Sequence, residues 1–416
     1  NVPPMKLFLG SLAIVFLASS LARAENWPMW RGPRLDGTSS ESSAPTRWGS
    51  NENITWKTAL PGAGHASPVV WQDHVFTVSA DENTHERLLV CVDRRDGTLL
   101  WKSTVVQAPA ERTHRLNTLA SSTPATDGER VFSAFLQGDR VVVAAHDFNG
   151  NEVWVQRPGV FASVHGFCSS PVLFEDKVIV NCDHDGDGYI VALARTDGRE
   201  LWRIDRPNKT RSYCPPLIRK AAGSTQMVLS GSKCVTSYDP ATGKLRWIID
   251  GPTEQFVASP VYSERHNLFF ITAGYPEHHI LAIRPDGHGN VTDTHIQWRT
   301  KKGAAYVPSP IVEGDYFLIV SDSGIAHCFE SASGRIVWTE RFGEQHASLV
   351  SAGGLVYFLN DKGVTHVVKP GPTFELIAKN EINEATFASP AISDGQIFIR
   401  GEKSLFCIGA ARSQTK

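Results

Sequence analysis

The sequence predicts an all-β fold: an eight-bladed β-propeller of four-stranded antiparallel blades, closed by an N-terminal strand that completes the last blade. Three observations support this prediction. A turn followed by a tryptophan-bearing strand recurs along the chain, a small residue followed by proline recurs between the tryptophans, and no long amphipathic helical stretch interrupts them. Short strands repeated at a regular period without helices are typical of propellers.

The first repeated feature is a glycine turn followed by tryptophan, as in "DGTLLWK" at 96 and "DGRELWR" at 197. It recurs at spacings of 40 to 53 residues and gives the series Trp56, Trp101, Trp154, Trp202, Trp247, Trp298 and Trp338, with Ala378 in the last copy. An indole on the outermost strand of a blade can cover the gap to the next blade and donate its N–H to a backbone carbonyl there. We therefore interpret these tryptophans as contacts between blades.

The second repeated feature is a small-residue and proline marker that precedes two further short apolar strands. Its eight copies are "HASPVV" at 65, "SSTPAT" at 121, "CSSPVL" at 168, "YCPPLI" at 213, "VASPVY" at 257, "VPSPIV" at 307, "HASLVS" at 346 and "FASPAI" at 387. Small residues suit the innermost strand of each blade, because the innermost strands converge on a central channel.

The two ends of the repeat region are complementary. The last unit stops at "SLFCIGA" without a tryptophan strand, while "NITWKT" at 53 stands alone before the first unit. We expect the N-terminal strand to complete the final blade, which would shield two open sheet edges.

The first residues have the character of a targeting segment. Lys6 precedes the apolar run "LFLGSLAIVFLASSLA", and Ala22-Arg23-Ala24 has the small residues that a signal peptidase reads. The run is shorter than the roughly 20 residues that a membrane span needs. We predict a signal peptide over residues 1–24, an N-terminal strap over 25–52, one propeller domain over 53–410, a tail over 411–416 and a periplasmic or secreted protein.

Composition excludes few functions. The net charge is only -2, so no surface for a polyanion is indicated, and nucleic acid is not an expected partner. The seven cysteines show no Cys-x-x-Cys spacing and no adjacent pair, so Cys91, Cys328 and Cys407 are interpreted as small buried residues on strands. A monomer without an integral membrane span after signal cleavage is expected.

The markers also carry a resemblance. Ser-Pro pairs and an Asp-x-x-Thr-Gly-x-x-x-Trp pattern, clearest in "SYDPATGKLRW" at 237, resemble the pyrroloquinoline quinone (PQQ)-like propeller repeat over roughly residues 53–410. This repeat is shared by quinoprotein dehydrogenases and the outer-membrane assembly lipoprotein. "WPMWRGPRLDGTS" at 27 and "DRPNKTRSYCPPLI" at 205 look like an uncharacterised secreted branch found in planctomycete-type bacteria. The resemblance implies a fold more strongly than an activity.

Propeller topology sorts the loops between two faces. With strands a to d counted from the channel outward, the d-to-a and b-to-c connections emerge on what we call the first face, and the a-to-b and c-to-d turns on the second face. Long loops on a rigid scaffold often carry function, and the long loops here belong to the first face. Residues just before the Ser-Pro strands should surround the mouth of the channel. We predict a ligand-binding set of His65, His114, Asn117, His165, Arg211, Tyr213, Tyr306 and His346, with Phe256 and Phe387 beside them.

This set would suit an anionic or planar polar ligand, because guanidinium and imidazole groups pair with carboxylates while rings offer stacking area. The alternative is that several of these side chains plug the channel and bond to loop carbonyls.

The loop "DHDGDG" at 183 has a second possible chemistry. Asp183, Asp185 and Asp187 match the opening of an EF-hand calcium loop, but its twelfth position is Ala194 and a strand follows. The three carboxylates are therefore low-ranking candidates for a divalent cation such as Ca²⁺. The alternative is that they bond to Arg206 or Arg211 on the adjacent loop.

Two functions are compatible with these observations. The first is a non-catalytic scaffold that binds a protein, peptide or glycan through the first face. The second, implied by the resemblance, is a quinoprotein oxidoreductase that uses PQQ, held by a cation and an arginine, on an alcohol or sugar, with Arg211, His114 and Asp183 as the first residues to test. The resembled dehydrogenases are longer and have two adjacent cysteines beside the cofactor, whereas no two cysteines are adjacent here. We therefore favour the scaffold, and no catalytic residue is assigned.

Overall fold

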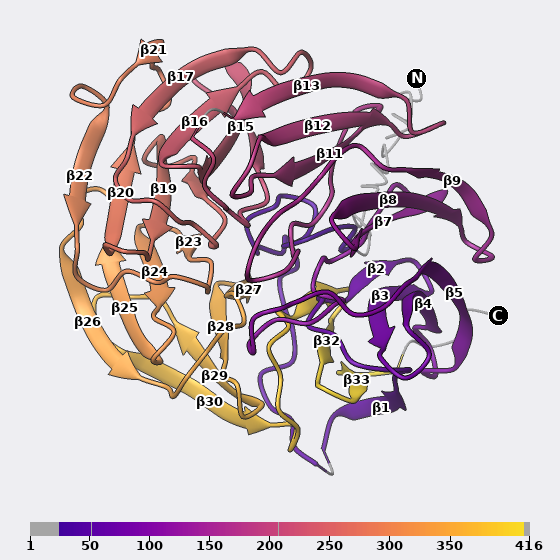
Figure 1. Cartoon of the computed structure of the whole chain (residues 1–416). Coiled ribbons are helices and arrows are strands. Elements are labelled where there is room, and N and C mark those ends of the chain that lie inside the picture. The colour runs from indigo at the N-terminus through magenta and orange to yellow at the C-terminus, as the bar shows by residue number, and fades with distance from the viewer. Residues whose placement is uncertain (1–24, 51, 207, 412–416) are drawn as a thin grey trace, which may run out of the picture.

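The computed structural model describes residues 25–411 except 51 and 207, and these residues form an eight-bladed β-propeller without helices. Figure 1 shows these sheets following one another in chain order around the middle of the molecule. The predicted fold class is confirmed. The predicted signal peptide and most of the predicted tail lie outside the described residues.

The strands of each blade run from the channel outward. Blades 1 to 4 are β2 (Val69–Trp71), β3 (His74–Asp81), β4 (Glu86–Asp93), β5 (Leu99–Gln107); β6 (Ala125–Thr126), β7 (Arg130–Gln137), β8 (Arg140–Asp147), β9 (Glu152–Gln156); β10 (Val172–Phe174), β11 (Lys177–Cys182), β12 (Gly188–Ala194), β13 (Glu200–Arg206); and β14 (Leu217–Ala221), β15 (Ser224–Gly231), β16 (Cys234–Tyr238), β17 (Leu245–Asp250), with β21 (Gly289–Asn290).

Blades 5 to 8 continue the same pattern. They are β18 (Val261–Ser263), β19 (Leu268–Ala273), β20 (His279–Ile283), β22 (Ile296–Thr300); β23 (Ile311–Glu313), β24 (Tyr316–Val320), β25 (Ile325–Glu330), β26 (Ile336–Arg341); β27 (Val350–Ala352), β28 (Leu355–Leu359), β29 (Val364–Lys369), β30 (Glu375–Glu381); and β31 (Ala391–Ser393), β32 (Gln396–Arg400), β33 (Ser404–Ile408), β1 (Ile54–Ala59).

The ring is closed by the N-terminal strand, as predicted. β1 pairs antiparallel with β33, from Ile54 opposite Ile408 to Ala59 opposite Ser404. Figure 1 shows these two strands, from opposite ends of the colour scale, side by side. Both chain ends are therefore held in one sheet.

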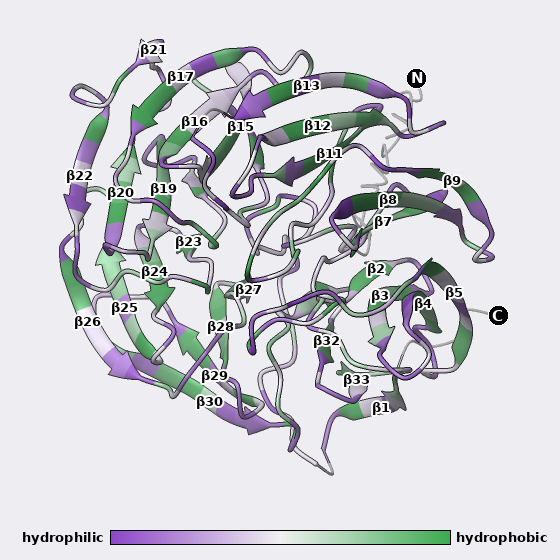
Figure 2. Ribbon diagram, in the orientation of Figure 1, coloured by the Kyte–Doolittle hydropathy of each residue, from purple (hydrophilic) through white to green (hydrophobic). Residues whose placement is uncertain are grey.

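The middle strands of the blades form the core. In Figure 2 strands such as β12, β19 and β20 are largely hydrophobic, whereas the outer strands β13 and β22 carry many hydrophilic residues. β12 is buried at every position, and β22 has no buried position. Cys91, Cys328 and Cys407 are buried and unpaired, in agreement with the prediction.

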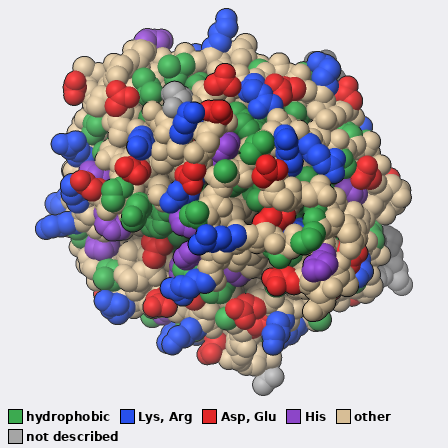
Figure 3. Space-filling model, viewed as in Figure 1, with side chains coloured by type: hydrophobic (Ala, Val, Ile, Leu, Met, Phe, Trp, Pro, Cys, Tyr) green, Lys and Arg blue, Asp and Glu red, His purple; other side chains and the backbone are tan. Residues whose placement is uncertain are grey.

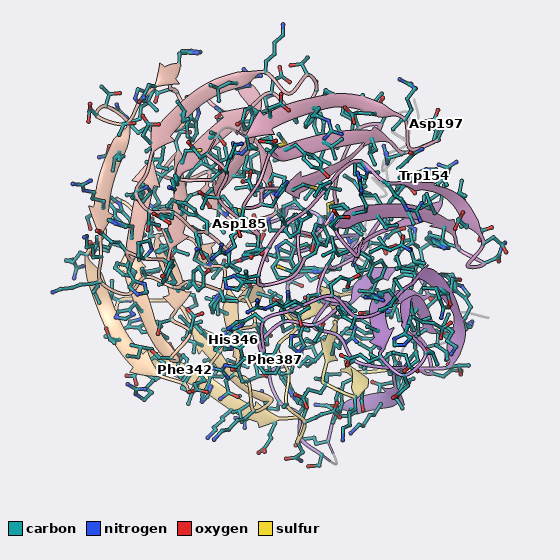
Figure 4. The ribbon with its side chains drawn as sticks, in the orientation of Figure 1. Trp154, Asp185, Asp197, Phe342, His346 and Phe387 are labelled. Atoms are coloured by element: carbon teal, nitrogen blue, oxygen red, sulfur yellow. The ribbon has the colours of Figure 1, made fainter. Side chains whose placement is uncertain are left out.

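The tryptophans join each blade to the next, as predicted. Six indoles donate their N–H to a backbone carbonyl in the c-to-d turn of the following blade, at 2.8 to 3.3 Å: Trp56 to Arg94, Trp101 to Phe148, Trp154 to Arg195, Trp202 to Pro240, Trp298 to Ser331 and Trp338 to Gly371. Figure 4 shows Trp154 beside Asp197, which lies in the turn that receives its indole.

The glycine in these turns is required by the indole above it. Gly198 has a φ of +73°, and a Cβ there would lie 2.7 Å from the Trp154 ring. Gly97 has the same relation to Trp56, with a φ of +79° and a closest ring atom at 2.8 Å. The repeat pairs glycine with tryptophan because the ring packs where a side chain would stand.

Blade 4 departs from the predicted four strands. The segment between β20 and β22 is longer than the other c-to-d turns, and β21 within it pairs in parallel with β17 as a fifth strand. Trp247, on β17, donates instead to the Gln226 side chain at 2.9 Å. The amide of Gln226 then donates to the Pro285 carbonyl of blade 5 at 2.8 Å, so a side-chain relay replaces the direct bond.

The missing tryptophan at Ala378 also has a structural reason. The next blade has no c-to-d turn, because β33 and β1 come from opposite ends of the chain. Trp48 of the strap belongs to the same hydrophobic cluster as Ala378, and it stacks on Tyr357 at a centroid distance of 6.4 Å. Its backbone N–H donates to the Asn380 side chain at 3.1 Å.

Hydroxyl groups join the innermost part of the ring. In six of the eight blades the backbone N–H of the marker residue donates to the hydroxyl of the equivalent residue in the next blade at 2.8 to 3.0 Å: Ser67 to Thr123, Thr123 to Ser170, Ser259 to Ser309, Ser309 to Ser348, Ser348 to Ser389 and Ser389 to Ser67. The marker residue of blade 4 is Pro215, which has neither a hydroxyl nor an N–H. Serine is therefore needed here for hydrogen bonding as well as for its size.

Substitution of Gly198 by alanine tests the coupling between turn and indole. Gly198→Ala is expected to destabilise the protein more than Gly223→Ala, since Gly223 has a φ of +76° but nothing within 4 Å of a Cβ. Both changes carry a backbone cost of about 1–2 kcal/mol, and the clash with Trp154 should add about 1–3 kcal/mol. Denaturant unfolding measures the difference, and equal losses of stability would contradict the coupling.

Candidate functional site

A cavity of about 380 Å³ lies inside the ring of innermost strands. Seven of the eight predicted ligand-binding residues line it: His65, His114, Asn117, His165, Tyr213, Tyr306 and His346. Phe387 lines it too, whereas Phe256 is fully buried in the core around β17 and β19. Figure 4 shows His346 and Phe387 close together near the middle of the ring. Propeller topology therefore brings together residues that are far apart in sequence.

The strap crosses the second face. Its backbone bonds to a-to-b segments of several blades, for example between Trp27 and Val70 at 2.9 Å and from Ser351 to Gly37 at 2.9 Å. Leu35 packs with Val172 in one hydrophobic cluster. The strap thus holds the second-face edges of separate blades together.

Trp30 and Arg31 of the strap enter the channel. Trp30 lines the cavity, and its indole donates to the Ser259 hydroxyl at 3.0 Å. In the series of bonds between marker residues, the Ser259 hydroxyl would accept the backbone N–H of residue 215. Pro215 has no N–H, and the Trp30 indole donates in its place. Arg31 is 2% exposed and donates to the Pro310 carbonyl of blade 6 at 2.6 Å. We infer that the strap forms the floor of the cavity.

His346 and His65 lie on either side of Phe387 and differ in electrostatic environment. Burial alone would lower the pKa of His346, but its bond to Asp361, 2.7 Å from Nδ1 to Oδ2, holds that pKa above its usual value. Burial, followed by the charge of Arg400, lowers the pKa of His65 to about 4. The lining therefore combines His65, whose protonation burial disfavours, with His346, whose protonation the bond to Asp361 favours.

His114 and His165 form a second imidazole pair, with ring centroids 5.3 Å apart. Nδ1 of His114 accepts the backbone N–H of Leu116 at 3.3 Å, which assigns the ring proton of the neutral form to Nε2. Nδ1 of His165 lies 3.1 Å from the Tyr213 hydroxyl, which in turn lies 2.5 Å from the Ser163 hydroxyl. Burial, with the nearby charge of Arg211, lowers the pKa of His165. Nε2 of His114 can therefore offer an N–H donor, and Nε2 of His165 does so when the Tyr213 hydroxyl donates to Nδ1.

Arg211 and the three aspartates of the 183–188 loop are not in the cavity lining. Arg206 bonds to Asp183 at 2.8 Å, and Arg211 bonds to Asp185 at 2.7 Å. Lys209 lies 2.8 Å from Asp187. The structure shows bonds to Arg206 and Arg211, which was the alternative to cation binding, and each carboxylate faces a different basic side chain.

The donor set does not fit a quinone held by a cation and an arginine. Arg211 is paired with Asp185 outside the cavity lining. Among the residues that the structure describes, no group of three or more His, Cys, Asp or Glu side chains is arranged to hold a metal ion. Cys168, the cysteine in the lining, has no adjacent cysteine in the sequence, and burial raises the pKa of its thiol to about 12.

Sequence reasoning missed three residues at the site. Asp322 lines the cavity, Asp361 binds His346, and Trp30, predicted only as part of the strap, lines the cavity as well. Asp322 and Asp361 each follow a b strand in a short turn on the first face, so loop sorting could have indicated them. Their repeated role is visible in the structure: each accepts the backbone N–H of the residue before a marker strand, Tyr306 at 2.8 Å and His346 at 2.9 Å.

Comparison with known proteins agrees with this architecture. A family model described as outer membrane protein assembly factor BamB matches residues 84–340 and 290–373, which together cover more than half of the chain. A BamB of Shewanella oneidensis is 22% identical over 213 residues, covering 49% of this chain and 52% of that protein. The match thus spans about half the length of this relative.

Two solved structures share the fold. BamB from Moraxella catarrhalis aligns with a TM-score of 0.62 at 13% identity, over 85% of this chain and 99% of that one. A quinohemoprotein alcohol dehydrogenase from Comamonas testosteroni aligns with a TM-score of 0.66 at 12% identity, over 94% of this chain and 82% of that one. At these identities the likeness shows the fold alone.

The opposite environments of His65 and His346 can be measured by NMR titration. In the wild type, His346 is expected to titrate above the usual histidine pKa and His65 at about 4. Asp361→Asn should lower the pKa of His346, because burial is then opposed only by the charges of Asp322 and Glu344. An unchanged His346 titration in this variant would contradict the assigned pairing.

Proposed function

Since the chain belongs to the PQQ-like propeller family whose model is described as outer membrane protein assembly factor BamB, we propose that it is a non-catalytic binding scaffold. It acts through the first face, in the periplasm or as a secreted protein, and its partner is a protein or peptide. The expected signal peptide over residues 1–24 supports this location. No helix among the described residues has the length and apolar character that crossing a membrane requires.

The observation that carries the proposal is a cavity that opens among exposed apolar and unpaired basic side chains. Val164, in a d-to-a loop, is 44% exposed, and Tyr275, in a b-to-c loop, is 54% exposed. Arg112 and Arg115, in the loop that contains His114, are exposed and make no ion pair within the described part of the chain. Figure 3 shows basic, acidic and histidine side chains interspersed over the face it presents. Exposed apolar groups beside a concave site are typical of interaction surfaces.

The name of the relatives supports a protein partner. The Shewanella oneidensis and Moraxella catarrhalis proteins are both named BamB, and the former is described as an outer membrane protein assembly factor. A family that includes an assembly factor favours recognition of another polypeptide over chemistry on a small molecule. A glycan is the less favoured ligand, because the loops offer exposed apolar and basic groups together.

Site-specific photocrosslinking tests the scaffold proposal. A photoreactive amino acid at Val164 or Tyr275 is expected to capture a discrete partner in envelope fractions. The same probe at Leu245 or Leu376, on the outer strands β17 and β30, should capture none. These controls match the test positions in exposure, at 51% and 45%. Capture from the outer strands alone would show that the first face is not the binding surface.

Addition of PQQ and Ca²⁺ tests the enzymatic alternative. Because the donor set does not fit, we expect no change in the absorbance of the cofactor and no dye reduction with a panel of alcohols and sugars. Turnover that depends on both additions would replace the scaffold with an oxidoreductase.

A further inference from the structure

The cavity has a floor, and this limits what it can accept. Trp30 lies in its lining, and Arg31 bonds to the Pro310 carbonyl on the innermost side of blade 6. A polypeptide that enters from the first face therefore cannot thread through the channel. Only the end of a chain, a side chain or a small molecule can occupy it. At about 380 Å³ the cavity lies near the small end of the usual range for ligand sites, which suits one or two residues.

Hydrogen-bond donors gather on one side of the cavity. His114 and His165 belong to the loops before blades 2 and 3, and each uses Nδ1 in a bond within the protein. Nε2 of His114 remains as a donor, and so does Nε2 of His165 when the Tyr213 hydroxyl donates to its Nδ1; neither atom has a partner within the described part of the chain. Arg112 and Arg115 flank His114 on the exposed part of the same loop, without ion pairs among the described residues. Imidazole donors in the lining and positive charge on the exposed arginines suit a carboxylate.

A hydrogen-bond acceptor lies across the ring. Asp322 belongs to blade 6, which is opposite blade 2 in a ring of eight. Its carboxylate accepts the backbone N–H groups of Tyr306 at 2.8 Å and Val307 at 3.1 Å. Because a carboxylate has about four acceptor sites, Asp322 can accept a further N–H from a ligand. It would also repel a carboxylate, so an acidic group is directed to the opposite side.

Aromatic rings form the walls between these two sides. His65 stacks on Phe387 at a centroid distance of 4.5 Å, and His346 lies 5.6 Å from the same ring. Trp30 and Tyr306 also belong to the lining. Such walls favour an aromatic group through offset or edge-to-face contacts.

We propose that the cavity binds the free carboxyl end of a peptide with an aromatic last residue, its carboxylate at His114 and His165 and its last amide N–H at Asp322. A peptide carboxyl end combines the three features that the cavity separates: an acidic acceptor, a neighbouring N–H donor and a side chain between them. This inference rests on the proposed scaffold function and names the part of the partner that enters the cavity.

Binding of short peptides tests the proposal directly. N-acetyl-glycyl-phenylalanine, as the free acid, is expected to bind saturably in calorimetry or NMR titration, and its carboxamide at least tenfold more weakly. Replacing the phenylalanine by alanine should weaken binding by a similar factor. Equal affinities of acid and amide, or tighter binding of glucose than of any acid in a set with different last residues, would overturn the proposal. So would an absence of saturable binding at millimolar concentrations of every acid.

Matched variants separate the cavity from the rest of the first face. His114→Ala is expected to weaken binding of the acid at least fivefold and to leave the amide unchanged, because the exposed imidazole donates to the carboxylate. His278→Ala removes an exposed histidine in a first-face loop outside the lining and should have no effect. Equal effects of the two variants would contradict the assigned carboxylate position.

The outcomes distinguish this inference from the scaffold function. If crosslinking at Val164 and Tyr275 captures a partner while no free-acid peptide binds, only the carboxyl-end inference fails. If peptide binding is found without crosslinked partner, the cavity is a ligand site and the scaffold proposal fails. If neither a crosslinked partner nor peptide binding is found, both the scaffold function and the carboxyl-end inference fail.

Discussion

The antiparallel pairing of β1 with β33 is the constraint on which the molecule depends. A ring of eight sheets has no free edge at its junction only if the last blade is completed by the opposite end of the chain. Closure also fixes the distance between opposite inner strands and thereby the size of the cavity. His114, Asp322 and His346 belong to different blades, so their arrangement exists only in the closed ring.

Contacts between neighbouring blades lie in two concentric layers, indoles outside and hydroxyls inside. At three places where the repeat is broken, a residue that the repeat does not predict makes a replacement contact. Gln226 accepts the indole N–H of Trp247 and donates to blade 5. Trp48 packs in the same cluster as Ala378. Trp30 donates to the Ser259 hydroxyl, to which Pro215 has no N–H to donate. The last of these ties the floor of the cavity to an irregularity in the ring. Trp30 thus both completes the contacts between blades 4 and 5 and lines the cavity.

Much of the fold was predictable, because a repeat multiplies weak local signals. The glycine and tryptophan turns, the eight markers and the unpaired end strands each pointed to the same closed ring. The fifth strand β21 was not predictable, since it depends on how far one long turn reaches across its neighbour. Loop sorting also placed seven of the eight chosen side chains around one cavity. It left open whether Arg211 lines the cavity or pairs with the loop at 183, because ion pairing between loops depends on geometry rather than order.

The central claim is that a ligand of the first face reaches a cavity whose floor is Trp30. Fluorine NMR of protein labelled with 5-fluorotryptophan tests it most directly, with Trp30→Phe used to assign one resonance among the 11 tryptophans. Addition of a first-face ligand should shift the Trp30 resonance and leave those of the outer tryptophans in place. Shifts confined to outer-strand tryptophans, with Trp30 unchanged at saturation, would contradict the account.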